Sequence, residues 1–223
     1  MTIGFLRNKT FQVFNDRGLY LTNSDLIKSF LIGKIQIKNE NDKKLRKQKK
    51  DHFMDDWKVF ENHANHTEIS MNDLFVMYKY YLLAQNPKKS LYDDLVIKLK
   101  DKDPNNVIVD IKEFLTNYKT KLYDKDDKLI YSFWYLRWGM YWKGILLTAL
   151  TENYSKHQEF AKVLRRYYYL NWIARFTLTK IKQTSFNHIK WIKEKKLLTE
   201  IENELNKNLI QNSTVNRPVD NLN

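Results

Sequence analysis

Apolar residues recur at helical spacing along almost the whole chain. Residues 26, 27, 30 and 31 are all apolar, and the same spacing returns over residues 74–82 and 108–122. This period places the apolar side chains on one face of an α-helix. The 223 residues include only 5 Gly and 3 Pro, which disfavours turn-rich β architectures. The sequence therefore predicts an all-α fold, a single domain of eight to ten helices over residues 1–211, with a disordered polar tail at 212–223.

Capping residues and helix breakers divide this pattern into separate helices. Ser70 and Ser90 are expected N-caps, because a serine side chain accepts hydrogen bonds from the free N–H groups of a helix start. The expected helices cover residues 51–63, 71–85, 91–100, 107–123, 129–153 and 156–179, with one or two more between 186 and 209. Residues 34–50 are expected to be an exposed helix or a connector. The stretch between residue 63 and Ser70 is expected to be a loop, and residues 101–106 a turn.

The composition limits both chemistry and location. No cysteine occurs, which excludes disulfides, thiolate catalysis and thiolate metal sites. Residues 129–151 are long and aromatic, but Arg137 and Lys143 stand in their middle. Each charge would cost about 2.5–3.5 kcal/mol at a bilayer centre. The first nine residues also lack an apolar signal core. We therefore expect a cytoplasmic protein with no membrane partner, in which residues 129–151 form a buried helix.

The chain is strongly basic. Its formal net charge is +13, from 39 Lys and Arg against 26 Asp and Glu. An excess of this size favours a polyanionic partner, with DNA or RNA as the candidates. The alternative is a compositional bias, because Lys and Asn are frequent throughout the sequence.

One stretch interleaves basic and aromatic residues. Residues 162–175 read KVLRRYYYLNWIAR. Cations bind phosphates and aromatic rings stack on unpaired bases, so the stretch is a candidate nucleic-acid contact. The candidate residues are Lys162, Arg165, Arg166, Tyr169, Trp172 and Arg175. The alternative is a core helix whose inner face is Val163, Leu164, Tyr167, Leu170 and Ala174. The Lys-rich residues 43–50 are a second candidate phosphate contact, or a solvated helix.

Residues 11–28 read FQVFNDRGLYLTNSDLIK and form a dense signature near the first residue. Asn15 and Gly18 readily enter left-handed geometry, which indicates a sharp turn. Thr22 or Ser24 is expected to cap the helix that follows. Nothing in the turn requires Asn15 and Arg17, which makes them candidate nucleotide contacts, because Asn can bind a base or ribose and Arg a phosphate. Asp25 is a third candidate, or it braces the turn.

This signature resembles the start of the helical region in domain-of-unknown-function family 262. That family commonly shows an aromatic residue, Asn-x-x-Gly, and Leu-[Ser/Thr]-x-x-Asp-Leu-Ile-[Lys/Arg]. The matching residues lie within 11–33 and are Phe14, Asn15, Gly18, Leu21, Thr22, Asp25, Leu26, Ile27 and Lys28. Weaker resemblances follow in Trp57 with Glu61, in the tyrosine-rich helix after them, and in residues 164–176 with Arg175. The resemblance covers residues 10 to about 209.

The resemblance implies a role in a larger system. In that family a ParB-like α/β domain, which carries Asp-Gly-Gln-Gln-Arg and hydrolyses nucleoside triphosphates, precedes the helical region. A His-Asn-His nuclease domain often follows, and many members are GmrSD-type restriction systems. This sequence contains neither the first motif nor a His-x-x-Pro nuclease signature. We therefore expect a split-gene product, a remnant or a fragment that serves as a helical accessory part of a GmrSD-like anti-phage defence protein.

The same resemblance bears on partners and cofactors. It implies a ParB-like NTPase or a nuclease chain as partner, and a chain that is not catalytic alone. NTP and Mg²⁺ would be bound only where a partner domain completes the site. His63 and His66, with Glu61 and Glu68 nearby, lie in the expected loop and are interpreted as solvated. Adjacent Asp pairs are interpreted as caps and solvated positions, because neighbouring residues on a helix point in different directions. We expect no metal site and no cofactor in this chain.

Overall fold

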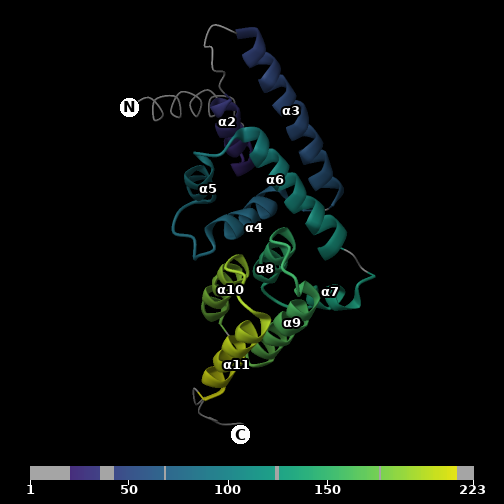
Figure 1. Ribbon diagram of the computed structural model, residues 1–223, viewed down its shortest axis with the longest axis vertical. Coiled ribbons are helices and arrows are strands. Elements are labelled where there is room, and N and C mark those ends of the chain that lie inside the picture. Colours follow the sequence, from purple (N-terminus) through teal and green to yellow (C-terminus); the bar gives the residue numbers. More distant parts are fainter. Residues whose placement is uncertain (1–20, 36–42, 68, 124–125, 176, 215–223) are drawn as a thin grey trace. The chain divides into compact units, whose positions relative to one another are not determined.

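The computed structural model describes residues 21–35, 43–67, 69–123, 126–175 and 177–214, and within these ranges the fold is all-α (Figure 1). The described ranges contain ten α-helices, one π-helical turn and no β-strand. The elements are α2 (Asn23–Lys34), α3 (Lys43–His66), α4 (Met71–Leu83), α5 (Leu91–Leu99), α6 (Pro104–Asn117), η1 (Tyr118–Leu122), α7 (Lys128–Phe133), α8 (Gly139–Thr151), α9 (His157–Ile173), α10 (Leu178–Lys193) and α11 (Leu198–Thr214). The prediction of an all-α fold with eight to ten helices is confirmed. None of the described helices is both long and apolar enough to cross a membrane.

The chain divides into two compact units. The first unit comprises Met1–Phe75 and Lys89–Val109, and the second comprises Val76–Lys88 and Asp110–Asn223. The division therefore falls within α4 and within α6. Each unit is described by itself below. The tail was expected from residue 212, but α11 continues to Thr214. Residues 215–223 and the candidate nucleotide contacts Asn15 and Arg17 lie outside the described residues.

The core of the first unit is aromatic. Trp57 on α3 is fully buried, and its ring centroid lies 5.9 Å from that of Phe53, 5.6 Å from Phe60 and 6.0 Å from Phe75. Edge-to-face and stacked aromatic pairs at such distances add to the hydrophobic gain of burial. The α2 helix packs on α5, and the Lys34 ammonium at its end donates to the carbonyl of Leu99 over 2.8 Å. Lys34 thereby satisfies a carbonyl at the C-terminal end of α5.

The N-cap residues of α2, α4 and α5 are those that the sequence predicts. Thr22 caps α2 in a capping box: its Oγ1 accepts from the Asp25 N–H over 3.2 Å, and the Asp25 carboxylate accepts from the Thr22 N–H over 3.0 Å. Ser90 caps α5 and accepts from the Asp93 N–H over 3.1 Å. Ser70 Oγ accepts from the Asp73 N–H over 3.0 Å at the start of α4. These three predictions are confirmed, with Thr22 rather than Ser24 as the cap of α2.

The second unit is built around α8, which packs on α9, on η1 and most extensively on α10. Five consecutive residues of α8, from Ile145 to Ala149, are all buried. The α11 helix and α7 both pack on α9. Because α8 is buried nearly all round, its charged residue Lys143 needs a special environment.

The expected single helix over residues 129–153 is wrong. It is interrupted between Phe133 and Gly139, where Trp138 adopts a left-handed φ of 62°. This break folds Trp134 back over Lys143, whose ammonium lies 4.0 Å from the centroid of the Trp134 ring. The rings of Trp142 and Tyr118 lie 5.5 and 5.8 Å away. A cation is attracted to aromatic faces at such distances, so the break supplies the environment that Lys143 needs.

Three further boundaries differ from the expectation. The expected helix 156–179 ends at Ile173, and Arg175 terminates it with a left-handed φ of 53°. The expected loop after residue 63 is helical through His66. The expected turn 101–106 ends earlier, because α6 begins at Pro104. Proline suits the first position of a helix, where its missing N–H costs nothing.

Several helix ends use left-handed residues other than glycine. Besides Arg175, they are Ala84, with a φ of 50°, Asn153, with 49°, and Lys195, with 55°, each one or two residues after the end of its helix. Glycine is the usual residue at this position, because it has no Cβ to clash in left-handed geometry. The small number of glycines in the sequence therefore has a local consequence at the ends of α4, α8, α9 and α10.

Candidate nucleic-acid interface

The solvent-facing side of α9 carries three cations and two large apolar residues. Lys162, Arg165, Arg166, Tyr169 and Ile173 are all exposed. At about 100° of rotation per residue, these five side chains fall within an arc of roughly 100°. The cations occupy the middle turns of the helix, and Tyr169, which is 50% exposed, and Ile173, which is 62% exposed, follow them. The helix thus presents cationic and apolar side chains in succession along one stripe.

The buried side of α9 differs from the inner face that the sequence suggested. Leu164 and Tyr167 are buried as expected, but Leu170 and Ala174 are exposed. Tyr168 and Asn171 are fully buried in their place. The buried set is Phe160, Ala161, Leu164, Tyr167, Tyr168 and Asn171. The buried face of α9 therefore includes Tyr168 and Asn171, and it lies further round the helix than the sequence indicated.

The two polar side chains that α9 buries in this orientation form hydrogen bonds with groups on α9 and α10. The Tyr168 hydroxyl shares a hydrogen bond of 2.7 Å with Ser185 Oγ, and the Asn171 amide donates to the Tyr167 carbonyl over 2.7 Å. A buried polar group is tolerated when it is hydrogen-bonded. Of the three consecutive tyrosines, only Tyr169 remains available for a ligand.

A second group of exposed aromatic residues lies at the end of α7. Tyr131 is 41% exposed and Tyr135 is 66% exposed, and their ring centroids lie 5.5 Å apart at an angle of 88°. The Tyr135 hydroxyl donates to the Tyr131 hydroxyl over 3.1 Å, and this hydrogen bond raises the pKa of Tyr135. Sequence reasoning missed these residues, because it placed them within a buried helix. No local signal could have found them, since their exposure depends on the break before α8.

Arg165 connects the two groups. Its guanidinium donates to Ser132 Oγ over 3.3 Å, and Ser132 lies next to Tyr131 on α7. We call Tyr131, Tyr135, Lys162, Arg165, Arg166 and Tyr169 the basic–aromatic face. Its cations can pair with phosphates, and its exposed rings offer stacking surfaces to unpaired bases.

The remaining candidates of this stretch are placed less favourably. Trp172 is half-buried, and its ring centroid lies 6.2 Å from that of Tyr169 at an angle of 73°. Trp172 therefore supports Tyr169 from the side. Arg175 is exposed in its left-handed position beyond the last turn of α9, where a cation suits the negative helix end.

The second basic candidate, residues 43–50, forms the start of α3 in the first unit. Residues 43–49 are all exposed, and the first buried residue of the helix is Phe53. The first turn contains no acidic residue. Cations are unfavourable at a helix N-terminus, because that end of the helix dipole is positive. These basic residues therefore do not stabilise the start of α3. The observation agrees with a solvated helix as well as with a phosphate contact.

The residues that carry the family resemblance meet in the first unit. The Trp57 indole N–H donates to Glu61 over 2.6 Å, and the Lys28 ammonium lies 3.8 Å from the Glu61 carboxylate. The same ammonium lies 5.7 Å from the centroid of the Trp57 ring. Asp25 is occupied by the cap of α2, where it also accepts from the Thr22 hydroxyl over 2.7 Å. Asp25 therefore braces the helix start.

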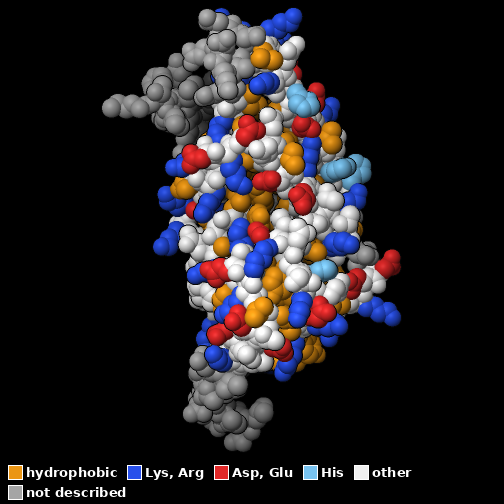
Figure 2. Space-filling model, in the orientation of Figure 1, with side chains coloured by type: hydrophobic (Ala, Val, Ile, Leu, Met, Phe, Trp, Pro, Cys, Tyr) orange, Lys and Arg blue, Asp and Glu red, His pale blue; other side chains and the backbone are white. Residues whose placement is uncertain are grey.

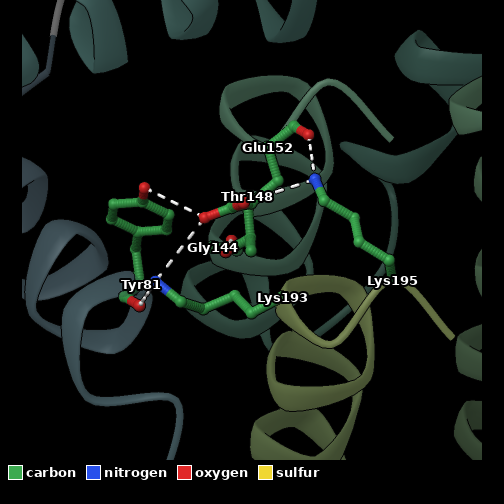
Figure 3. Close-up of polar contacts among 6 residues, drawn as sticks. All are labelled: Tyr81, Gly144, Thr148, Glu152, Lys193 and Lys195. Carbon is green, nitrogen blue, oxygen red and sulfur yellow. Dashed lines mark hydrogen bonds and ion pairs between the residues drawn. The ribbon is translucent and has the colours of Figure 1, made fainter. Parts of the chain in front are cut away.

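A polar cluster joins three helices of the second unit (Figure 3). The Glu152 carboxylate accepts from the Tyr81 hydroxyl over 3.1 Å and lies 3.6 Å from the Lys193 ammonium and 3.3 Å from that of Lys195. Lys193 also donates to the Tyr81 carbonyl over 3.2 Å. Burial and the neighbouring Glu152 raise the pKa of Tyr81. A tyrosine with a raised pKa is poorly suited to act as a base, so the cluster is a structural link.

The described residues contain no group of three or more His, Asp or Glu side chains that could hold a metal ion. His63 and His66 are exposed on the last turn of α3 rather than in a loop, and the carbonyl of Asn62 lies 2.6 Å from His66 Nδ1. Figure 2 shows Lys and Arg spread over the visible surface with Asp and Glu between them. The local arrangement of cations and rings therefore says more about binding than the net charge does.

Comparisons of the chain with protein-family models, with curated proteins and with solved structures give no match.

Proposed function

We propose that this chain binds single-stranded nucleic acid through the basic–aromatic face of the second unit. The observation that carries the proposal is the arrangement on α9, where Lys162, Arg165 and Arg166 share an exposed stripe with Tyr169. Arginine and lysine pair with backbone phosphates, and a tyrosine ring stacks on any unpaired base. The paired rings of Tyr131 and Tyr135 extend the stacking surface beside Arg165. Unpaired bases can reach these rings, whereas the bases of a duplex are already stacked on one another.

The proposal predicts a preference for single strands with little sequence specificity. Stacking contributes about 1–3 kcal/mol per base by alanine substitution and tolerates every base. Fluorescence anisotropy with a labelled single-stranded oligonucleotide, its RNA equivalent and the matching duplex would test the preference. Equal affinity for the duplex would remove the role proposed for the rings. Undetectable binding to all three at low salt would refute the proposal.

The cations can be tested against a control of equal charge. Arg165→Ala combined with Arg166→Ala removes two charges from the face, and Lys119→Ala combined with Lys207→Ala removes two exposed charges elsewhere in the second unit. For single strands, the slope of log K against log salt is about −0.7 per phosphate contacted. The arginine variant should lower that slope by about 1.4, and the lysine variant should leave it nearly unchanged. If both variants weaken binding equally, the affinity reflects overall charge and no defined site.

We propose as a second candidate that the chain is the helical accessory part of a GmrSD-like anti-phage restriction system. Its support is the contact among Lys28, Trp57 and Glu61, because these residues come from two separate parts of the resemblance to family 262. In this role a ParB-like NTPase or nuclease chain supplies the NTP and Mg²⁺ site, Asn15 and Arg17 face it, and Asp25 holds the start of α2 beside them.

This second candidate makes a distinct prediction. The purified chain alone should not hydrolyse nucleoside triphosphates, and affinity capture from its native cells should recover a stoichiometric partner with an α/β NTPase domain. Asn15→Ala and Arg17→Ala should then lower hydrolysis by that complex. Hydrolysis by the isolated chain that Asn15→Ala abolishes would refute the accessory role.

A further inference from the structure

A cleft of about 350 Å³ lies in the second unit and shares no lining residue with the basic–aromatic face. It is formed by the segment that joins α8 to α9 and by the segment that joins α10 to α11. Its lining residues include three lysines, Lys156, Lys195 and Lys196, and two hydroxyl residues, Ser155 and Thr199. No acidic residue is among those that line it. The cleft therefore collects positive charge and hydrogen-bond donors.

Two helix ends of the same kind build this cleft. After α8, Asn153 is left-handed and the Tyr154 N–H donates to the Ala149 carbonyl over 2.8 Å. After α10, Lys195 is left-handed and the Lys196 N–H donates to the Trp191 carbonyl over 2.9 Å. Both patterns are Schellman motifs, which reverse the chain sharply at a helix end.

A hydrogen bond holds the two motifs together. The Tyr154 hydroxyl donates to the Lys196 carbonyl over 2.7 Å. The Glu152 cluster of Figure 3 adds a second link, since Lys195 donates to the carbonyl and the carboxylate of Glu152. The walls of the cleft are thus fixed by contacts that do not involve a ligand.

Some of the donors that line the cleft already have a partner in the protein, and others are open to a ligand. Lys195 is held by Glu152, and the Lys196 ammonium lies 4.9 Å from the centroid of the Trp191 ring. Lys156 is exposed and has no ion pair within the described residues. The backbone N–H groups of Leu198 and Thr199, the first residues of α11, likewise have no hydrogen-bond partner among the described residues. Such N–H groups at a helix start favour an anion, and the Glu200 carboxylate already accepts from the neighbouring Leu197 N–H over 3.2 Å.

We propose that this cleft binds a phosphomonoester. The ammonium groups of Lys156 and Lys196 can balance a dianion, and the hydroxyls of Ser155 and Thr199 can donate to further phosphate oxygens. The absence of arginine from the lining disfavours planar, two-pronged recognition of a carboxylate. The volume exceeds that of a single phosphate, so the cleft accommodates the small polar body that carries the phosphate. This proposal does not rest on the nucleic-acid face, because the two share no residue.

Two sources could supply the phosphomonoester, a free sugar phosphate or the phosphorylated end of a nucleic acid. Isothermal titration calorimetry of the full chain with inorganic phosphate and with ribose 5-phosphate tests the first source. A comparison of oligonucleotides with and without a 5′-phosphate tests the second. Saturable binding of inorganic phosphate or ribose 5-phosphate supports the proposal, as does tighter binding of the 5′-phosphorylated oligonucleotide than of its unphosphorylated match, and the arm that responds identifies the source. No binding of either small ligand at millimolar concentration, together with equal affinity for the two oligonucleotides, overturns it, whatever the basic–aromatic face does.

Substitutions locate the binding. Lys156→Gln combined with Lys196→Gln should weaken binding by on the order of tenfold or more, because charge-assisted hydrogen bonds are the strong ones. Lys119→Gln, at an exposed lysine outside the cleft, should leave the affinity unchanged. Unchanged affinity in the double variant would overturn the proposal. Amide NMR shifts of Leu198 and Thr199 in the wild-type chain give a readout that does not depend on any variant folding, and their constancy during a phosphate titration would also overturn it.

Discussion

His188 should make the second unit sensitive to mild acid. Its side chain is fully buried on α10, and neither ring nitrogen has a hydrogen-bond partner among the described residues. The neighbouring rings of Tyr167 and Trp191 lie 5.4 and 5.5 Å away by centroid. Burial lowers the pKa of His188 from 6.5 to about 3, because the charged form would lose its hydration without gaining a partner. The folded protein therefore keeps this ring neutral at pH values where the unfolded chain protonates it.

The size and sign of the effect follow from proton linkage. The unfolded state binds more protons below about pH 6.5, so stability is complete above that value and falls as the pH drops toward 3. With these two pKa values, the loss at about pH 5 is on the order of 2 kcal/mol relative to about pH 8. A loss of this size is a large fraction of the stability of a typical domain.

Urea unfolding of the wild-type chain and of His188→Leu at both pH values measures the effect. The variant replaces two unpaired polar atoms with an apolar side chain of similar size. It should lose the pH dependence and should be at least as stable as the wild type at about pH 8. His157→Gln, at an exposed histidine of α9, is the control and should keep the dependence. Equal pH dependence in His188→Leu and in the wild type would refute the reasoning.

Three further outcomes are expected. Thr22→Ala removes the cap of α2 and should lower the free energy of unfolding of the first unit by about 1 kcal/mol, whereas Thr22→Ser should not; urea unfolding measures both. Tyr81→Phe removes the hydrogen bond to Glu152 and should destabilise the second unit by about 1 kcal/mol, and a neutral result would show that Lys193 satisfies the carboxylate alone. Tyr169→Ala should weaken binding of a single-stranded oligonucleotide by about 1–3 kcal/mol and leave duplex affinity nearly unchanged, and an equal loss for both would remove the stacking role.

The helix starts could be predicted, whereas the break in the longest aromatic segment could not. Thr22 and Ser90 act within three residues of themselves, so local sequence specifies their role. The break at Trp138 depends instead on a cation and rings that meet only in the folded chain, with Lys143 among Trp134, Trp142 and Tyr118. Periodicity alone indicated a continuous helix there, because tertiary contacts override helical propensity.

The exposed cations of the candidate interface could be predicted from the sequence, whereas the choice of its aromatic residues could not. The exposed positions of Lys162, Arg165 and Arg166 follow from the charge of these side chains. The choice between Tyr168 and Tyr169 for the core depends on a hydrogen bond to Ser185 from another helix, which no local pattern encodes. Asn15 and Arg17 stay predictions, since they lie outside the described residues.

The left-handed residues after α4, α9 and α10 indicate how this protein could be made more stable without touching its core. Ala84, Arg175 and Lys195 each adopt a backbone conformation that costs a non-glycine residue about 1 kcal/mol. Glycine would remove that cost in the folded state, although it adds freedom to the unfolded chain. Ala84→Gly is the cleanest place to begin, because it removes only a methyl group. At Lys195 the same change would also remove the ion pair with Glu152. The left-handed backbone at this position is therefore accompanied by a favourable charge contact that glycine could not make.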